Sequence, residues 1–448
     1  MVSARGRPTN RTGRTPRSED SPEILGRIHL SYHILNRAGA IRGPYRAGNA
    51  RLPGPTMPNL SLGEHTAGSV AVVGTKPDNL QRLTLCLVSD DDVLDRVPTA
   101  VRFLQVGLID EPVDVILILQ DHDRAQTLVS GPTSVVKYRR ATWPFHHWTG
   151  RNVVAALRKR IDGFSHDGPV IVQGLTLATA PMAASIATQL GAELVLVVES
   201  AVGFNETESL RTLSQAATLI TPTETIRGAL KASPLAAQSV EVIRAGVQTD
   251  DAPAAFNETK NTPSVVFAGA LNARSGVDTL LRATKRVLRR HPNVQLFIIG
   301  KGAAEADFRH LARSLDISLN VTFAGRLDPS RPALRAADIF CIPRALPEFR
   351  EEPVHAMASG LAIVAARGVQ CDGLIHRQTA LLCAERDEED MSSQICWYLE
   401  NPQTAKSIGA TAQAYAREHH SVSRMVNDYL RVYRRLAGRL GTLPLTAN

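Results

Sequence analysis

The feature that most constrains the fold is a regular alternation of short apolar runs with helix-length segments from residue 83 onward. The runs at 115–119, 194–198 and 296–300 are continuously apolar and do not alternate with polar residues. Strands of that kind are buried on both faces, as in parallel sheets covered by helices. The alternation therefore predicts βαβ units and an α/β protein.

The alternation occurs twice, which predicts two domains in a chain of 448 residues. A polar, proline-containing stretch at 249–263 separates the two halves and is predicted to be a linker. The predicted boundaries are a basic N-terminal segment at 1–78, domains at 79–250 and 251–420, and a C-terminal helix within 421–448.

The net charge of +8 comes almost entirely from the N-terminal segment. Residues 1–55 hold ten arginines and three acids, which gives +7 and leaves the rest of the chain near neutral. Nucleic acid is therefore not an expected partner. The composition of 1–78 predicts disorder; the alternatives are an organelle transit peptide and a start at Met57.

The five cysteines are odd in number and show no CxxC or zinc spacing. Free thiols in a reducing compartment are the expected state, which favours a cytoplasmic protein. The apolar runs fall short of the roughly 20 residues that a membrane-spanning helix needs. An integral membrane protein is therefore not expected.

The segment 336–366 is the predicted active-site region. An apolar run at 338–342 ends at Pro343, a polar loop carrying Glu348 follows, and a second apolar run begins at Leu361. This pattern predicts strand, loop, helix and strand, with the loop at the carboxyl edge of a parallel sheet. Ligands of open α/β sheets bind at that edge.

Two other polar groups have a simpler structural explanation. Asp90, Asp91 and Asp92 follow the first strand and are predicted to cap a helix rather than to bind a metal. The aromatic and histidine residues of 143–148 are predicted to pack under a loop, the alternative being that they stack on a sugar.

Several motifs of the second half resemble those of the retaining glycosyltransferases of the GT-B fold. In chain order they are FAGALNARSGVD at 267–278, IIGKG at 298–302, VTFAG at 321–325, ADIFCIP at 337–343 and HAMASGLAIVA at 355–365. The resemblance implies two doubly wound Rossmann-like domains that face each other across a cleft. It also implies that the final helix packs back on the first domain.

The resemblance implies transfer of a sugar from a UDP- or GDP-sugar to a glycan or lipid-linked acceptor, with retention at the anomeric carbon. The acceptor would bind in 79–250 and the nucleotide sugar in 251–420, without a metal or other cofactor. The arginines of the last helix offer a peripheral contact with an anionic membrane surface, at its inner face.

The sequence departs from the family at its chemical positions. The two family glutamates of the loop fall on Pro347 and His355, and the family's phosphate-binding Arg and Lys fall on Ala270 and Ser275. The candidate catalytic residues are Glu199 and Glu348. The candidate donor-binding residues are Gly269, Arg274, Ser275, Lys301, Arg326 and His355.

These departures leave two alternatives to an active transferase. One is a non-catalytic GT-B domain that binds nucleotide sugar or glycan as the partner of another transferase. The other is an epimerase of the same two-domain fold, for which the chain lacks a matching acid pair.

Overall fold

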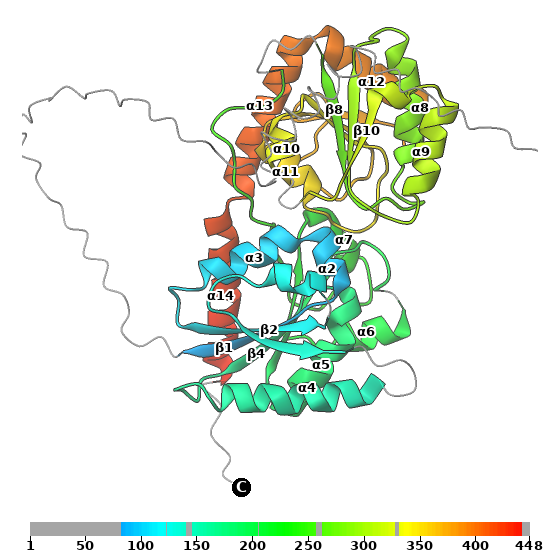
Figure 1. The fold of residues 1–448 in the computed structure, drawn as a ribbon. Coiled ribbons are helices and arrows are strands. Elements are labelled where there is room, and N and C mark those ends of the chain that lie inside the picture. Colours follow the sequence, from blue (N-terminus) through cyan, green and yellow to red (C-terminus); the bar gives the residue numbers. More distant parts are fainter. Residues whose placement is uncertain are drawn as a thin grey trace, which may run out of the picture.

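The structure is a computed structural model, and it describes residues 82–121, 123–139, 146–204, 206–256, 262–327 and 331–440. Figure 1 shows two lobes, each built on a parallel sheet with helices packed around it. The predicted disordered segment at 1–78 lies outside the described residues.

The N-terminal domain contains a seven-stranded parallel sheet in the order β3-β2-β1-β4-β5-β6-β7. The order reverses between β1 and β4, which makes that edge the topological switch point. Its strands are β1 (Leu83–Val88), β2 (Val113–Gln120), β3 (Ser134–Tyr138), β4 (Val170–Gly174), β5 (Glu193–Val197), β6 (Thr218–Thr221) and β7 (Val240–Val242).

The C-terminal domain contains a six-stranded parallel sheet in the order β10-β9-β8-β11-β12-β13. Here the order reverses between β8 and β11, so the two strands flanking the switch point are the ones that carry the first and fourth family motifs. The strands are β8 (Ser264–Ala268), β9 (Gln295–Ile299), β10 (Val321–Gly325), β11 (Ile339–Ile342), β12 (Ala362–Ala366) and β13 (Leu381–Cys383).

Helices connect most successive strands in both domains, whereas no helix of the described residues lies between β12 and β13. In the N-terminal domain they are α2 (Asp91–Arg96), α3 (Pro98–Gly107), α4 (His146–Ile161), α5 (Ala180–Leu190), α6 (Thr207–Leu213) and α7 (Glu224–Lys231), with 3₁₀ turns η1 (Asp123–Leu128) and η2 (Leu177–Thr179). In the C-terminal half they are α8 (Val277–Leu288), α9 (Glu305–Ser314), α10 (Arg331–Arg335), α11 (Glu352–Ala358), α12 (Glu388–Glu400), α13 (Pro402–His419) and α14 (Val422–Leu440), with η3 (Ser318–Asn320).

The continuously apolar runs form the central strands, as predicted. β1 is buried at every position and so is β12, because helices cover both faces of each sheet. The predicted helix cap at the first strand is also present: the Asp90 carboxylate accepts a hydrogen bond from the Val93 N–H at 3.3 Å.

The structure corrects three sequence-based boundaries. The edge strand β3 was not predicted, since its residues are only partly buried and its pattern is weak. The residue pattern predicts a helix at 152–160, and the structure begins this helix earlier, at His146. The motif at 355–365 predicts a helix that begins at His355, but α11 begins at Glu352, which places His355 one turn inside it.

The chain crosses between the domains twice, at neighbouring places. Val247 pairs with Ser421 in an isolated parallel bridge, and the Val247 N–H donates to the His420 carbonyl at 2.8 Å. After the second crossing, α14 runs along the N-terminal domain, where it packs against α3 and β4 (Figure 1). The last helix of the chain therefore completes the first domain.

Several arginines of α14 that were expected to offer a membrane contact form ion pairs with acids. Arg434 pairs with Glu111 and Arg435 with Glu241, each at 2.7 Å, and Arg431 pairs with Asp428 at 2.8 Å. None of the helices in the described ranges combines the length and apolar character that crossing a bilayer requires. All five cysteines are buried and free.

Candidate functional site

A cavity of about 430 Å³ lies between the two domains. Its C-terminal wall comes from the ends of β8, β9 and β10, and its N-terminal wall from α2 and α3. A second, smaller cavity of about 60 Å³ lies between the ends of β8 and β11, at the switch point. Both cavities are therefore at the carboxyl edge of the C-terminal sheet, where the predicted site lies.

Small residues form the wall that the two cavities share. Ala268, Gly269 and Ala270 line both cavities, and Gly300 lines the larger one. Gly300 has φ of +148°, and a Cβ at this position would lie 1.8 Å from the Gly269 carbonyl oxygen. Only glycine allows the turns after β8 and β9 to approach each other so closely. The carboxyl ends of these two strands therefore remain open to the cleft.

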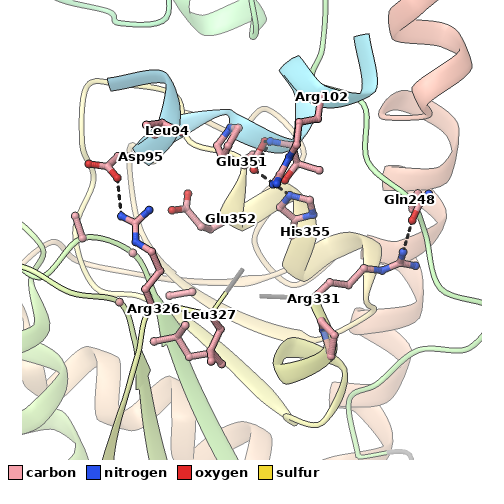
Figure 2. A pocket seen from close by; sticks show the side chains of 18 of the residues that line it. Leu94, Asp95, Arg102, Gln248, Arg326, Leu327, Arg331, Glu351, Glu352 and His355 are labelled. Atoms are coloured by element: carbon pink, nitrogen blue, oxygen red, sulfur yellow. Dashed lines mark hydrogen bonds and ion pairs between the residues drawn. The ribbon is translucent and has the colours of Figure 1, made fainter. Parts of the chain in front are cut away.

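Ion pairs fix the arginines around the larger cavity. Arg326, at the end of β10, pairs with Asp95 of the N-terminal domain at 2.7 Å. Arg331 pairs with the buried Asp250 at 2.6 Å and donates to Gln248 at 2.7 Å (Figure 2). The guanidinium groups therefore border the cavity in fixed positions.

The carboxylate of Glu351 caps a helix of the opposite domain. It accepts hydrogen bonds from the backbone N–H groups of Thr99 at 3.1 Å and Ala100 at 3.2 Å, in the first turn of α3. Val97, the N-cap residue of α3, makes no side-chain cap of its own. Burial pushes the pKa of Glu351 upward, but the bonds from His355 and Thr99 outweigh it and lower the pKa below its ordinary value.

Residues 347–351, which we call the interdomain brace, also bind the N-terminal domain through their backbone. The Phe349 N–H donates to the Glu199 carbonyl at 2.7 Å, and the Pro347 carbonyl accepts from Ala201 at 2.9 Å. The Glu351 N–H donates to the Arg96 carbonyl at 2.9 Å. The loop predicted to hold the active site is therefore also a contact between the domains.

Glu199 and Glu348, the two candidate catalytic residues, both have arginine partners. Glu348 pairs with Arg274 at 3.1 Å beside the smaller cavity. Glu199 is buried, pairs with Arg96 at 2.6 Å and accepts from the Leu177 N–H at 2.9 Å. Burial raises the pKa of Glu199 to about 7 despite the opposing charge of Arg96. Glu199 lines a separate hollow, formed mostly by the N-terminal domain and in part by the interdomain brace, and is not among the residues that line the larger cavity.

The structure brings most of the candidate donor-binding residues to the two cavities. Gly269, Arg326 and His355 line the larger cavity, and Ser275 lines the smaller one. Arg274 reaches the smaller cavity only through Glu348. Lys301 is exposed and is not among the residues that line either cavity.

Sequence reasoning missed several residues that the structure places in the cleft. Glu352 projects into the larger cavity between Arg326 and His355 (Figure 2). The larger cavity also includes Asp95, Arg102, Arg331, Arg335 and Glu351. The sequence marks the loop as charged, but it does not indicate which of the acids faces which partner.

The described ranges contain no group of three or more His, Cys, Asp or Glu side chains placed to hold a metal ion. The aromatic candidates Trp143, His146, His147 and Trp148 are outside the residues whose side chains the structure describes.

Residues 262–401 match the family described as glycosyl transferases group 1. This range contains strands β8 to β13, among them the strands whose ends border the two cavities, and the whole interdomain brace. The similarity to this family therefore includes the loop that was predicted to hold the site.

Two curated relatives illustrate the similarity in sequence. A GDP-mannose-dependent monoacylated alpha-(1-6)-phosphatidylinositol monomannoside mannosyltransferase of Corynebacterium glutamicum is 28% identical over 172 residues, which are 36% of this chain and 45% of that protein. A phosphatidyl-myo-inositol mannosyltransferase of Mycolicibacterium smegmatis is 31% identical over 198 residues, 42% of this chain and 49% of that protein. The match thus spans a little under half the length of these relatives.

Solved structures resemble the chain over both domains. A glycosyltransferase from Rickettsia africae superposes with a TM-score of 0.66 at 14% identity, over 79% of this chain and 98% of the other. Anabaena HepE, solved in complex with UDP, gives a TM-score of 0.62 at 15% identity, over 79% of this chain and all of the other. The chain has the GT-B fold. At these identities the likeness to solved structures concerns the fold alone.

Proposed function

We propose that the protein is a glycosyltransferase that moves a sugar from a UDP- or GDP-sugar to a glycan or lipid-linked acceptor, with retention at the anomeric carbon. The observation that carries the proposal is the interdomain cavity at the ends of β8, β9 and β10, within the range that matches glycosyl transferases group 1. Its small-residue wall leaves room for a nucleotide, and its arginines offer charge to a diphosphate.

The acceptor class rests on similarity to proteins named as phosphatidylinositol mannosyltransferases. A lipid-linked acceptor would bring the protein to the inner face of a membrane. Co-sedimentation with anionic vesicles tests that part, and equal recovery with neutral and anionic vesicles would count against it. We also propose that catalysis needs no metal, so that EDTA leaves the rate unchanged.

A non-catalytic nucleotide-sugar-binding domain is the second candidate. It is favoured by Pro347 and His355 at the family's glutamate positions, and by the pairing of Arg274 with Glu348. The missing cationic side chains at Ala270 and Ser275 would weaken stabilisation of the leaving group, a contribution of about 3 kcal/mol per donor in other enzymes.

Two measurements separate these candidates. A thermal-shift panel of nucleotides and nucleotide sugars should show stabilisation by UDP or GDP and their sugars; stabilisation by none of them would rule out both candidates. Donor hydrolysis and transfer to candidate acceptors then distinguish an enzyme from a binding domain.

His355 is the proposed ribose contact of this site. Because a neutral imidazole exchanges hydrogen bonds with a hydroxyl, His355→Ala should weaken nucleotide binding about tenfold. His310→Ala, an exposed histidine on α9, is the matched control and should bind as the wild type does. Unchanged affinity in His355→Ala would show that the ribose lies elsewhere.

A further inference from the structure

Three glutamates follow one another closely along the brace and the start of α11. Two of them have strong partners, since Glu348 pairs with Arg274 at 3.1 Å and Glu351 accepts from two backbone N–H groups of α3. The third, Glu352, differs from both. It forms a long ion pair with Arg350, in which nitrogen and oxygen are 4.0 Å apart.

The Glu352 carboxylate has spare hydrogen-bonding capacity. Its Oε2 atom is buried and has no hydrogen-bond partner among the described residues. A buried acceptor that lacks a partner is costly, and such atoms in native proteins usually serve a ligand or water. Burial raises the pKa of this carboxyl to about 7, with Arg350 opposing the shift.

The position of Glu352 links the two cavities. Its side chain lines both of them, together with Ala268, Gly269 and Ala270. Ala268, Gly269 and Ala270 have no polar side chain. Among the residues that line both cavities, Glu352 therefore supplies the polar group. Figure 2 shows it projecting into the larger cavity, between Arg326 and His355.

We propose that Glu352 accepts hydrogen bonds from the hydroxyl groups of a sugar ring of the bound nucleotide sugar. The inference rests on the proposed function. A carboxylate oxygen among small residues is a suitable acceptor for sugar hydroxyls. A diphosphate is disfavoured at the same spot, because two anions would then lie together in a half-buried site.

The proposal gives nucleotide-sugar binding a defined pH dependence. The charged groups facing Glu352 are Arg350 and Glu351 from the brace, His355 one turn along α11, Arg326 from β10 and Asp95 from α2. Hydroxyl groups bind the ionised carboxylate best. Affinity should therefore rise by roughly tenfold between pH 6 and pH 8 as Glu352 loses its proton.

Calorimetric titration with UDP-glucose and GDP-mannose tests the proposal, because these diesters do not titrate in that range. At pH 8, Glu352→Gln should bind the accepted donor about tenfold more weakly than the wild type and should show no pH dependence. Glu352→Asp should keep the dependence with intermediate affinity. Glu351→Gln removes a neighbouring charge and should retain the pH dependence, and Glu389→Gln on α12 should behave as the wild type.

The outcomes are distinct. Wild-type protein that binds neither probe overturns the proposed function and this inference together. Binding by the wild type with an unchanged Glu352→Gln affinity overturns the inference alone. Tighter binding of the nucleotide sugar by Glu352→Gln than by the wild type at pH 8 also overturns the inference. That result would place the phosphates beside Glu352. Loss of the pH dependence in Glu351→Gln would assign that dependence to the Glu351–His355 pair.

A 2′-deoxyribose analogue of the donor separates the two sugar rings. If Glu352 holds the ribose, the analogue should bind the wild type more weakly but lose little further affinity in Glu352→Gln. If Glu352 holds the transferred sugar, the two losses should be additive. A loss with the analogue that is the same in Glu352→Gln as in the wild type, together with an equal weakening of UDP and UDP-glucose binding by Glu352→Gln, would overturn the assignment to either ring.

Discussion

At the scale of single residues, the cleft is defined by how its carboxylates are paired. Asp95, Glu348 and Glu351 each have a cation or backbone donors close by, whereas Glu352 has one oxygen without a partner among the described residues. Paired carboxylates hold the walls of the cavity in place. Glu352, which has spare hydrogen-bonding capacity, remains available to a ligand.

The titration of Glu352 should appear in the stability of the protein. An acid whose pKa is raised on folding binds its proton more tightly in the folded state. The contribution of Glu352 to the free energy of unfolding is therefore fully present below about pH 4.5 and is lost as pH rises to about 7. Relative to the wild type, Glu352→Gln should gain about 1–3 kcal/mol of unfolding free energy between pH 5 and pH 8.

Urea denaturation at four pH values measures this difference. The exposed Glu389→Gln provides the matched change and should follow the wild-type curve. A Glu352→Gln curve parallel to that of the wild type would contradict the raised pKa.

At the scale of elements, the turns after β8 and β9 form the cleft wall because their backbones approach closely. Gly300→Ala would place a methyl group 1.8 Å from the Gly269 carbonyl oxygen, at a φ that disfavours alanine. We expect a loss of about 3 kcal/mol or more in unfolding free energy, together with loss of nucleotide binding.

A second glycine-to-alanine substitution provides the control for Gly300→Ala. At Gly228, on the exposed face of α7, no atom beyond the backbone of its own helix and its two chain neighbours lies within 4 Å of the place that an added methyl group would occupy. Gly228→Ala should therefore stabilise the protein by about 0.5–1 kcal/mol. Similar melting temperatures for the two variants would refute the close-approach argument.

The cap that Glu351 supplies to α3 gives the brace a second testable consequence. Glu351→Ala should cost about 1–2 kcal/mol, as loss of a helix cap does, and should speed amide exchange at Thr99 and Ala100. Glu385→Ala, an exposed substitution in the same domain, controls for the loss of charge. Unaltered exchange at both amides would show that the cap contributes little in solution.

At the scale of the whole molecule, the two domains depend on each other through the ends of the chain. α14 lies beyond the C-terminal domain in sequence but buries its apolar face, including Leu430, Tyr433 and Leu436, in the N-terminal domain. The Tyr433 hydroxyl donates to the Gln173 side chain of β4 at 2.7 Å. We therefore expect the stability of the N-terminal sheet to depend on the last helix.

Leu436→Ala tests this dependence. The side chain is fully buried, so the truncation should cost about 2–5 kcal/mol and should speed hydrogen exchange in β1 and β4 more than in β8 and β12. Leu319→Ala, at an exposed position, should change neither. Equal acceleration in both sheets would instead indicate that the domains unfold as a single unit.

Much of the fold could be predicted from the sequence because burial on both faces leaves a local signal. Continuous apolar runs identified most of the central strands, and the motifs from 267 to 365 placed the cleft at the correct edge of the C-terminal sheet. The edge strand β3 was missed because an edge strand needs less burial, so its apolar pattern is weaker.

The sequence by itself determined the α/β class, the strand–helix order and the loop where the site would lie, since these follow from local periodicity. Tertiary structure decided which acids of that loop are already engaged. Glu351 meets Thr99 across 252 residues and Arg326 meets Asp95 across 231, so both pairs exist only once the domains face each other. The free capacity of Glu352 follows from the same arrangement, because a carboxylate is available to a ligand only where the folded chain brings it no partner.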